Sequence, residues 1–320
     1  MVKKKFGWWP QLILLALIIA GVIIVVIRLN KWNSSTVEID PNIDPSEFAN
    51  ESLDMSFHID KPILEEHGDD GVNRMLVMGN YMVQKTSESG MTLLGEIKKK
   101  LPDWEITDIS ANQSMIAAPE FISDDEFPIG KYWSPFTLYY LVKGMCTRDY
   151  ANQEYNKYET GCFTHEDPDE YMAVYEGIDL NDYDVLVLMY ASTDYYQSSI
   201  LYSDADEFDV TTYMGALKSS IKMLQECYPH LRIVVSSPFL TYSEWEGERC
   251  LGSLTNFGSG TEAEYAMREY LVCTEYCVSF VDNYFSFIDE NNIDEYVDYT
   301  VLTDKGVDAV SDHFVEFMQE

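Results

Sequence analysis

Polar side chains follow several short apolar runs of this chain, at places where a fold could bring chemical groups together. Asn80 follows the first run, Thr193 and Asp194 follow a later one, and Asp298 precedes the last amphipathic segment. An amide or hydroxyl can donate a hydrogen bond to a developing oxyanion, and a carboxylate can orient a general base. These residues therefore predict a polar pocket.

The elements that must position these residues alternate between buried strands and amphipathic helices. Strands are predicted at 74–79, 104–109, 184–190, 231–236 and 278–281. Helices are predicted at 92–101, 211–227, 261–271 and 303–318, the last with Thr303 as its N-cap. This alternation predicts a three-layer α/β/α sandwich with a parallel, flavodoxin-like sheet. Function in such folds lies at the carboxyl ends of the strands, where the polar residues stand.

The first 32 residues differ from the rest and predict a cytoplasmic stub followed by one N-terminal transmembrane helix. Leu12 to Ile27 contains no charged residue, and Lys3 to Lys5 precede it, which favours a cytoplasmic N-terminus. A cleaved signal peptide is the alternative, and it fits less well because no small-x-small cleavage site follows the apolar run. We therefore expect a single-pass protein of the cell membrane with most of the chain outside the cytoplasm.

Two further segments interrupt the regular pattern. Residues 33–71 are polar and rich in Asp, Asn and Pro, which predicts a stalk or linker with a short strand near 55–59. Residues 115–182 are rich in Tyr, Asp and Glu, and such a long connection predicts an insertion. Its aromatic residues could form a carbohydrate or peptide surface, and a local mini-core is the reading that we favour. The α/β domain is accordingly predicted to span 72–320.

The strong negative charge of the chain limits the classes of partner that it can bind. The sequence carries 21 Lys and Arg against 55 Asp and Glu, a net charge of −34. Leaving out residues 1–33, with their five basic residues, gives 16 basic against 55 acidic residues, or −39. Such a domain repels nucleic acid and anionic lipid, so we expect neither as a partner.

The cysteines and one acidic loop are the candidates for disulfides and metal. An even number of cysteines is compatible with disulfides outside the cytoplasm, and their pairing stays open: Cys146, Cys162, Cys227, Cys250, Cys273 and Cys277. Cys146 and Cys162 could staple the insertion. Asp204, Asp206 and Asp209 alternate in a loop and would suit calcium, but the glycine and distal glutamate of an EF-hand are missing. We expect a solvated acidic loop, no metal and no cofactor.

Four blocks of the chain, in order, resemble the secreted serine hydrolases of the SGNH (GDSL-type) family. Gly79-Asn80-Tyr81 stands where the family has Gly-Asp-Ser, and Ala111 stands near its oxyanion-hole glycine. Ala191 to Asp194 corresponds to the family's Gly-x-Asn-Asp, so Thr193 replaces the asparagine. Asp298 to Val301 corresponds to Asp-x-x-His. The resemblance covers roughly 74–320, apart from the insertion, and implies a flavodoxin-like fold and hydrolysis or transfer of acyl esters.

The replacements within these blocks predict a degenerate member that lacks the nucleophilic serine and the catalytic histidine. We expect a binding or accessory component of the cell envelope, whose partner is a cell-surface glycan or another envelope protein. Its candidate pocket consists of the residues at family positions, namely Asn80, Tyr81, Ala111, Thr193, Asp194, Asp298 and Val301.

Two alternatives stay open. One is an active esterase, O-acetyl transferase or deacetylase on cell-surface glycans, with Ser114 or Ser192 as nucleophile and a histidine from the insertion. The other is a structural envelope protein whose insertion binds the partner.

Overall fold

Five parallel strands form the central sheet of the computed structural model, which describes residues 53–59, 71–118, 134–158, 167–190 and 192–320. The strands lie in the order β2-β1-β3-β4-β7. Their bounds are β1 Asn73–Gly79, β2 Trp104–Asp108, β3 Val185–Met189, β4 Arg232–Ser236 and β7 Ser279–Val281. Every neighbouring pair is parallel, and this order is the flavodoxin-like one. The predicted sheet is therefore confirmed.

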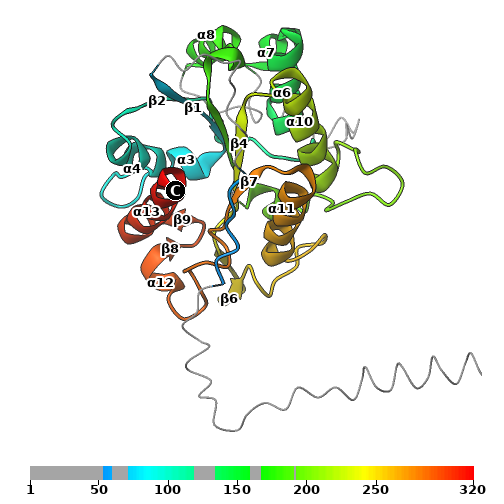
Figure 1. Cartoon of the computed structure of the whole chain (residues 1–320). Helices are drawn as coiled ribbons and strands as arrows, with labels where there is room; N and C mark the ends of the chain where they lie inside the picture. Colours follow the sequence, from blue (N-terminus) through cyan, green and yellow to red (C-terminus); the bar gives the residue numbers. More distant parts are fainter. Residues whose placement is uncertain (1–52, 60–70, 119–133, 159–166, 191) are drawn as a thin grey trace, which may run out of the picture. The chain divides into compact units, whose positions relative to one another are not determined.

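Helices cover both faces of this sheet (Figure 1). Helices α4 (Leu93–Lys100) and α13 (Asp304–Gln319) pack on one face, and α6 (Leu138–Thr147), α10 (Tyr213–Cys227) and α11 (Glu262–Tyr276) pack on the other. Side chains of β1 alternate accordingly, with Met75 and Val77 in one core and Leu76 and Met78 in the other. All five residues of β3 are buried, as expected for a central strand.

Threonine caps fix where three of these helices begin. The side-chain oxygens of Thr92, Thr212 and Thr303 accept hydrogen bonds from the backbone N–H groups three residues later. Each cap satisfies a donor that the first helical turn leaves free. The prediction that Thr303 caps the last helix is confirmed.

The segment predicted as an insertion supplies part of the main core. It contains η1 (Ser134–Phe136), α6, α7 (Ala151–Asn156), α8 (Pro168–Gly177) and η2 (Leu180–Asp182). Phe136, Tyr171 and Tyr175 belong to the same buried cluster as Leu76 of β1 and Leu186 of β3. The expectation of a separate mini-core is therefore wrong for the described part of this segment, because its aromatic side chains complete one layer of the sandwich.

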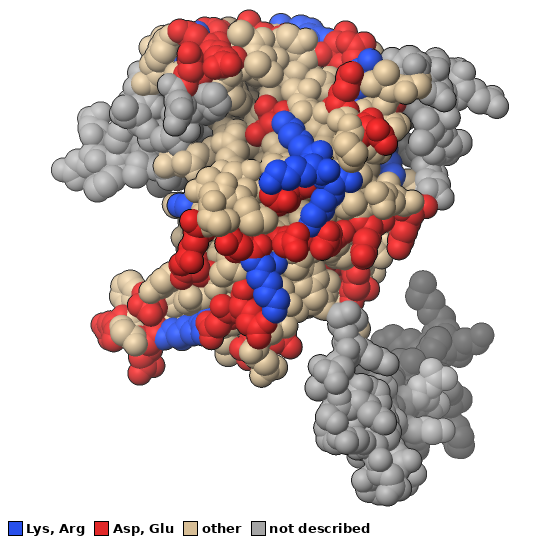
Figure 2. All heavy atoms as spheres, turned by 90° about the vertical axis from the view of Figure 1, so that its left-hand side faces the viewer, with Lys and Arg blue, Asp and Glu red and all other residues tan. Residues whose placement is uncertain are grey.

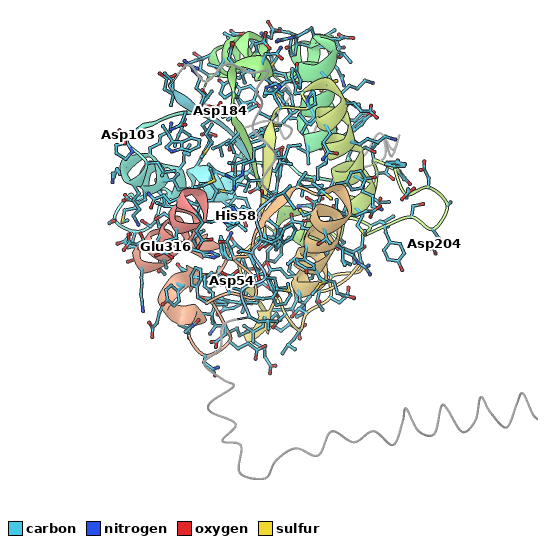
Figure 3. All side chains as sticks on the ribbon, viewed as in Figure 1. Asp54, His58, Asp103, Asp184, Asp204 and Glu316 are labelled. Atoms are coloured by element: carbon cyan, nitrogen blue, oxygen red, sulfur yellow. The ribbon has the colours of Figure 1, made fainter. Side chains whose placement is uncertain are left out.

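The segment 53–59 packs on the edge of the sheet, where a short strand was expected. Phe57 and Phe280 exchange two backbone hydrogen bonds of 3.0 Å in a single antiparallel bridge next to β7. The ring of His58 stacks on Phe317 of α13 at 3.8 Å between centroids. Figure 3 labels Asp54 and His58 at this edge. Covering β7 in this way protects backbone groups that an open edge would expose.

The remaining short elements surround the carboxyl ends of the strands. Helices α3 (Tyr81–Gln84) and α9 (Thr193–Tyr196) follow β1 and β3. Strands β5 (Tyr242–Trp245) and β6 (Glu248–Leu251) form one hairpin, and α12 (Ile293–Tyr296) leads into a second, β8 (Val297–Asp298) and β9 (Val301–Leu302).

The predicted membrane span at 12–27 lies outside the described residues. Within the described ranges, no helix is both long and apolar enough to cross a bilayer. Acidic side chains are spread over the face shown in Figure 2, with a small group of basic side chains in its middle.

Candidate functional site

Four strands of the sheet end at the same level, which places the residues after them along one edge. Gly79 of β1 pairs with Met189 of β3, which pairs with Ser236 of β4, which in turn pairs with Val281 of β7. A side chain at position 79 would overlap the carbonyl oxygen of Met189 and come within 2.8 Å of Val83 Cγ2. Glycine is therefore required at the end of β1, and it brings α3 close to β3.

Asn80, directly after this glycine, joins the ends of β1 and β3. Its side chain is fully buried, donates from Nδ2 to Thr193 Oγ1 at 3.0 Å and accepts from the N–H of Met82 at 3.3 Å. Asn80 thus caps α3 and positions Thr193. These two residues of the predicted pocket are in contact with each other.

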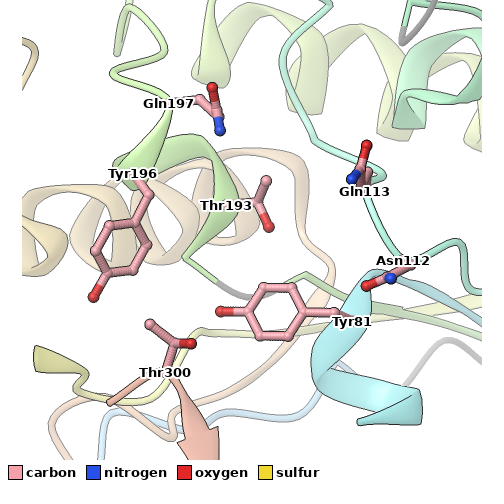
Figure 4. A pocket seen from close by; sticks show the side chains of 7 residues that line it. All are labelled: Tyr81, Asn112, Gln113, Thr193, Tyr196, Gln197 and Thr300. Carbon is pink, nitrogen blue, oxygen red and sulfur yellow. The ribbon is translucent and has the colours of Figure 1, made fainter. Parts of the chain in front are cut away.

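A pocket of about 340 Å³ lies at this edge of the sheet. Each described side chain that lines it is polar and uncharged, and four of the seven carry a hydroxyl. The seven lining residues are shown in Figure 4: Tyr81, Asn112, Gln113, Thr193, Tyr196, Gln197 and Thr300. Figure 4 shows the Tyr81 ring lying between Thr300 and Asn112, with its hydroxyl toward Thr300 and Tyr196. The pocket can therefore donate and accept hydrogen bonds without presenting a charge.

Tyr81, at the position of the family serine, has a phenol that stays protonated at neutral pH. Burial raises its pKa to about 12, against the effect of a hydrogen bond with Thr300, and the charge of Glu262 contributes in the same direction as burial. A phenol with this pKa supplies almost no phenolate near pH 7. Tyr81 is thus a hydrogen-bonding residue of the pocket wall and no activated nucleophile.

A buried carboxylate, Glu262, lies close enough to the pocket for its charge to raise the pKa of both Tyr81 and Tyr196. It accepts from the Thr241 N–H at 2.8 Å, from Thr241 Oγ1 at 2.6 Å and from Ser192 Oγ. Thr241 Oγ1 is also 2.8 Å from the Tyr196 hydroxyl. Burial raises the pKa of Glu262 to about 7, although these hydrogen bonds lower it. A chain of hydroxyls therefore connects the pocket lining to a carboxylate that titrates near neutral pH.

One atom of a lining residue has no partner. Gln113 Oε1 is buried and accepts no hydrogen bond from any described residue. An orphaned buried acceptor costs roughly 1–3 kcal/mol.

Two other predicted residues lie elsewhere. Asp194 is fully buried and accepts hydrogen bonds from the N–H groups of Ile116 and Ala117 at 2.8 and 3.0 Å. Burial raises its pKa to about 6. Ala111 is buried and its N–H donates to the carbonyl of Gly79 at 3.0 Å. Neither residue lines the pocket: Asp194 fixes the chain after β2, and the Ala111 N–H is already used.

The hairpin before α13 presents a different residue to the pocket from the one the family motif indicates. Asp298 and Val301 pair with each other across β8 and β9, Asp298 is exposed, and its carboxylate is 3.5 Å from the Tyr242 hydroxyl. Thr300, in the turn between them, lines the pocket instead. Tyr299 allows this tight turn with a positive φ of 57°.

The alternative nucleophiles are engaged with groups other than histidine. Ser114 Oγ donates to the carbonyl of Phe136 at 2.6 Å, and Ser192 Oγ to Glu262. Of the described histidines, His58 and His313 lie at the β7 edge and His230 precedes β4 at the opposite end of the sheet. His165, the candidate from the insertion, lies outside the described residues.

Two carboxylates of the acidic loop bond to the backbone of the loop itself. Asp206 and Asp209 accept hydrogen bonds from nearby backbone N–H groups, of Phe208 and Thr211 respectively. Figure 3 shows Asp204 on the outside of this loop. Among the described residues, no group of three or more acidic, histidine or cysteine side chains could hold a metal ion.

Several residues of the site were missed in the sequence. Asn112, Gln113, Tyr196 and Gln197 lie within a few residues of predicted strand ends, so the strand-end rule could have included them. No strand end precedes Thr300 or Glu262 closely enough to indicate them in the sequence. The turn of the β8–β9 hairpin determines the position of Thr300, and the packing of α11 determines that of Glu262.

Comparison with known proteins supports the fold. No protein-family model matches the chain, and no curated protein matches it. One solved structure overlaps with a TM-score of 0.51 at 14% identity, over 78% of this chain and 96% of its own. A possible lipase from Chitinophaga pinensis gives a TM-score of 0.48 at 11% identity, over 77% of this chain and 97% of its own. An aryl esterase of M. smegmatis gives a TM-score of 0.44 at 14% identity, over 78% of this chain and 99% of its own.

The described domain therefore shares its parallel α/β/α fold with the first of these structures, as the alternating strands and helices of the sequence predicted. Identities this low concern the arrangement of the chain, and the chemistry must be argued from the pocket itself.

Proposed function

We propose that this domain binds a small, neutral, polyhydroxylated ligand, such as a unit of a cell-surface glycan, and does not hydrolyse it. The observation that carries this proposal is a pocket lined, among the described residues, only by uncharged hydroxyl and amide side chains. Sugar hydroxyls and acetamido groups exchange hydrogen bonds with such side chains, and tyrosine rings pack on sugar faces.

Charge excludes the anionic members of this ligand class. The buried carboxylate of Glu262 acts on the pocket, and the chain carries a net charge of −34. Among the described residues, no lysine or arginine lines the pocket to offset these charges. An acidic polymer would therefore meet repulsion at close range and at a distance.

The lack of hydrolysis follows from the groups at the family positions. The pKa of Tyr81 is about 12, Thr300 and not a histidine faces it, and Val301 stands at the position of the base. A triad acts as a unit, so the absence of both nucleophile and base removes its contribution to the rate, roughly a million-fold.

We propose further that the N-terminal segment holds the domain at the outer face of the cell membrane, because residues 12–27 are uncharged and basic residues precede them. Extraction of cell membranes with alkaline carbonate tests this: the full chain should stay in the pellet, and its recovery in the supernatant would refute an anchor.

We expect Gln113→Leu to weaken ligand binding and at the same time to stabilise the fold. The substitution removes a lining amide that can hydrogen-bond the ligand, so the affinity for N-acetylglucosamine tetramer should fall about tenfold. It also removes a buried unsatisfied atom, so the free energy of unfolding should rise by about 1 kcal/mol. Isothermal titration and urea unfolding measure the two effects.

Gln153→Leu is the matched control, because Gln153 is a buried glutamine whose amide donates to the carbonyls of Pro135 and Tyr140 at 2.8 and 3.1 Å. It should lose stability and keep its affinity. Equal affinity of wild type and Gln113→Leu, or no binding of any neutral oligosaccharide by the wild type, would refute the proposed function.

An active esterase is the second candidate, favoured by the contact of Ser192 Oγ with a carboxylate whose pKa is about 7. Such a carboxylate could take the proton of a serine. Ser192 is only 4% exposed, however, and does not line the pocket. A fluorophosphonate probe decides: labelling of Ser192, with turnover of p-nitrophenyl acetate that is lost in Ser192→Ala, would favour the esterase over the binding domain.

A further inference from the structure

Two cysteines meet where helices α6 and α10 end, on the side of the sheet that carries the larger core. Cys146 is the second-last residue of α6, and Cys227 is the last residue of α10. The two helices pack against each other, as Figure 1 shows. Cys146 is half-buried and Cys227 is exposed, and both are free thiols.

The residues beside the two cysteines fix this meeting point. The Tyr228 hydroxyl, next to Cys227, donates to the carbonyl of Met145, next to Cys146, at 3.1 Å. The Cys146 thiol points at α10, with Sγ 4.0 Å from the carbonyl of Met223, one helical turn before Cys227. The Cys227 thiol is near enough to the Cys146 thiol to raise its pKa.

We propose that Cys146 and Cys227 form a reversible disulfide that links α6 to α10. This pairing is independent of what the pocket binds. It differs from the staple between Cys146 and Cys162 that the sequence suggested, and Cys162 lies outside the described residues.

The exchange begins at the exposed thiol. The Cys227 thiolate attacks a low-molecular-weight disulfide such as oxidised glutathione, and one glutathione thiolate leaves. The Cys146 thiolate then attacks Cys227 Sγ, and the second glutathione leaves. The two cysteines lose two protons and two electrons, and the glutathione disulfide is reduced to two thiols. Burial raises the pKa of Cys146, as does the neighbouring thiol, whereas the charge of Arg148 favours the attacking thiolate.

A disulfide here would restrict the unfolded chain, because it closes the segment from 146 to 227. Loops of this length give stabilisation at the upper end of the usual range. We therefore expect the oxidised chain to melt roughly 5–10 °C above the reduced chain.

Peptide mapping tests the pairing in the full-length chain. After incubation with oxidised glutathione and alkylation of the remaining thiols, trypsin releases Cys146 in peptide 144–148, Cys227 in 223–232 and Cys162 in 158–218. We expect 144–148 to be joined to 223–232 under non-reducing conditions. A link from 144–148 to 158–218, or alkyl groups on both Cys146 and Cys227, would overturn the proposal.

Melting temperatures provide a second readout. Cys146→Ser and Cys227→Ser should each melt at the same temperature with and without oxidised glutathione. Cys250→Ser is the control, because Cys250 lies in the β5–β6 hairpin, and it should keep the full increase. An increase that persists in Cys227→Ser would also refute the pair.

Discussion

We expect Glu262→Gln to lose less stability than the wild type when the pH rises from 5 to 8. The difference between the two losses in free energy of unfolding should be about 2–3 kcal/mol. Glu262 is fully buried, and its pKa in the folded chain is about 7 against an ordinary value of 4.5. The folded state therefore holds a proton that the unfolded state has released, and stability is lost as pH rises through this window. Urea unfolding at several pH values measures the effect.

Glutamine suits the site because its amide reproduces the hydrogen bonds of the carboxylate. Its oxygen can accept from the Thr241 N–H, and its NH₂ group can donate to the Ser192 and Thr241 hydroxyls. Above pH 7 the variant should thus be more stable than the wild type, since no charge is buried. Asp194, whose pKa is raised to about 6 by burial, titrates in both proteins and cancels in the comparison.

Glu316→Gln, on the exposed face of α13, is the control and should leave the pH dependence unchanged. If Glu262→Gln and the wild type lose the same stability from pH 5 to pH 8, Glu262 is not a buried carboxyl with a pKa of about 7.

The sequence predicts the sheet well because local patterns decide it. The run at 185–189 is apolar on both faces and so can only be central, and Thr303 precedes a helix whose apolar residues recur at helical spacing. The strand-end rule likewise brings Asn80, Tyr81 and Thr193 together, since adjacent parallel strands end at one edge.

The rest of the site depends on contacts between distant segments, which no local pattern contains. Glu262 occupies the first turn of α11, where a glutamate normally faces solvent, and Thr241 and Ser192 arrive from two other strand ends to receive it. Thr300 enters the pocket because the β8–β9 hairpin pairs Asp298 with Val301 and turns the residue between them inward. Family spacing alone pointed to the two paired residues.

The pocket is built of groups that suit binding more than bond cleavage. Its hydroxyls are held by neighbours, as Asn80 holds Thr193 and Thr241 holds Tyr196. The carboxylate that titrates near pH 7 acts through Thr241 and lies behind the lining, so it can tune the hydrogen bonding of Tyr196 without reaching a ligand. We therefore see Glu262 as a positioning residue.

Gly79→Ala should destabilise the fold by about 3 kcal/mol or more, the largest effect expected of any single methyl group at this site. The added Cβ would overlap the Met189 carbonyl oxygen and lie 3.1 Å from its carbonyl carbon. Both atoms belong to the backbone of a central strand whose neighbours on each side are hydrogen-bonded to it. The clash can be relieved only by separating β1 from β3, which costs ladder hydrogen bonds and core packing. Thermal unfolding should show a fall in melting temperature of about 6 °C or more.

Gly177→Ala is the matched control, because a Cβ at the exposed end of α8 meets no atom within 4 Å. Its free energy of unfolding should stay within about 1 kcal/mol of the wild type, since alanine replaces glycine in a helix. A Gly79→Ala protein as stable as this control would mean that β1 and β3 do not approach each other at their carboxyl ends. The contact of Asn80 with Thr193 would then be lost as well, because it depends on the same approach, and with it the wall of the pocket.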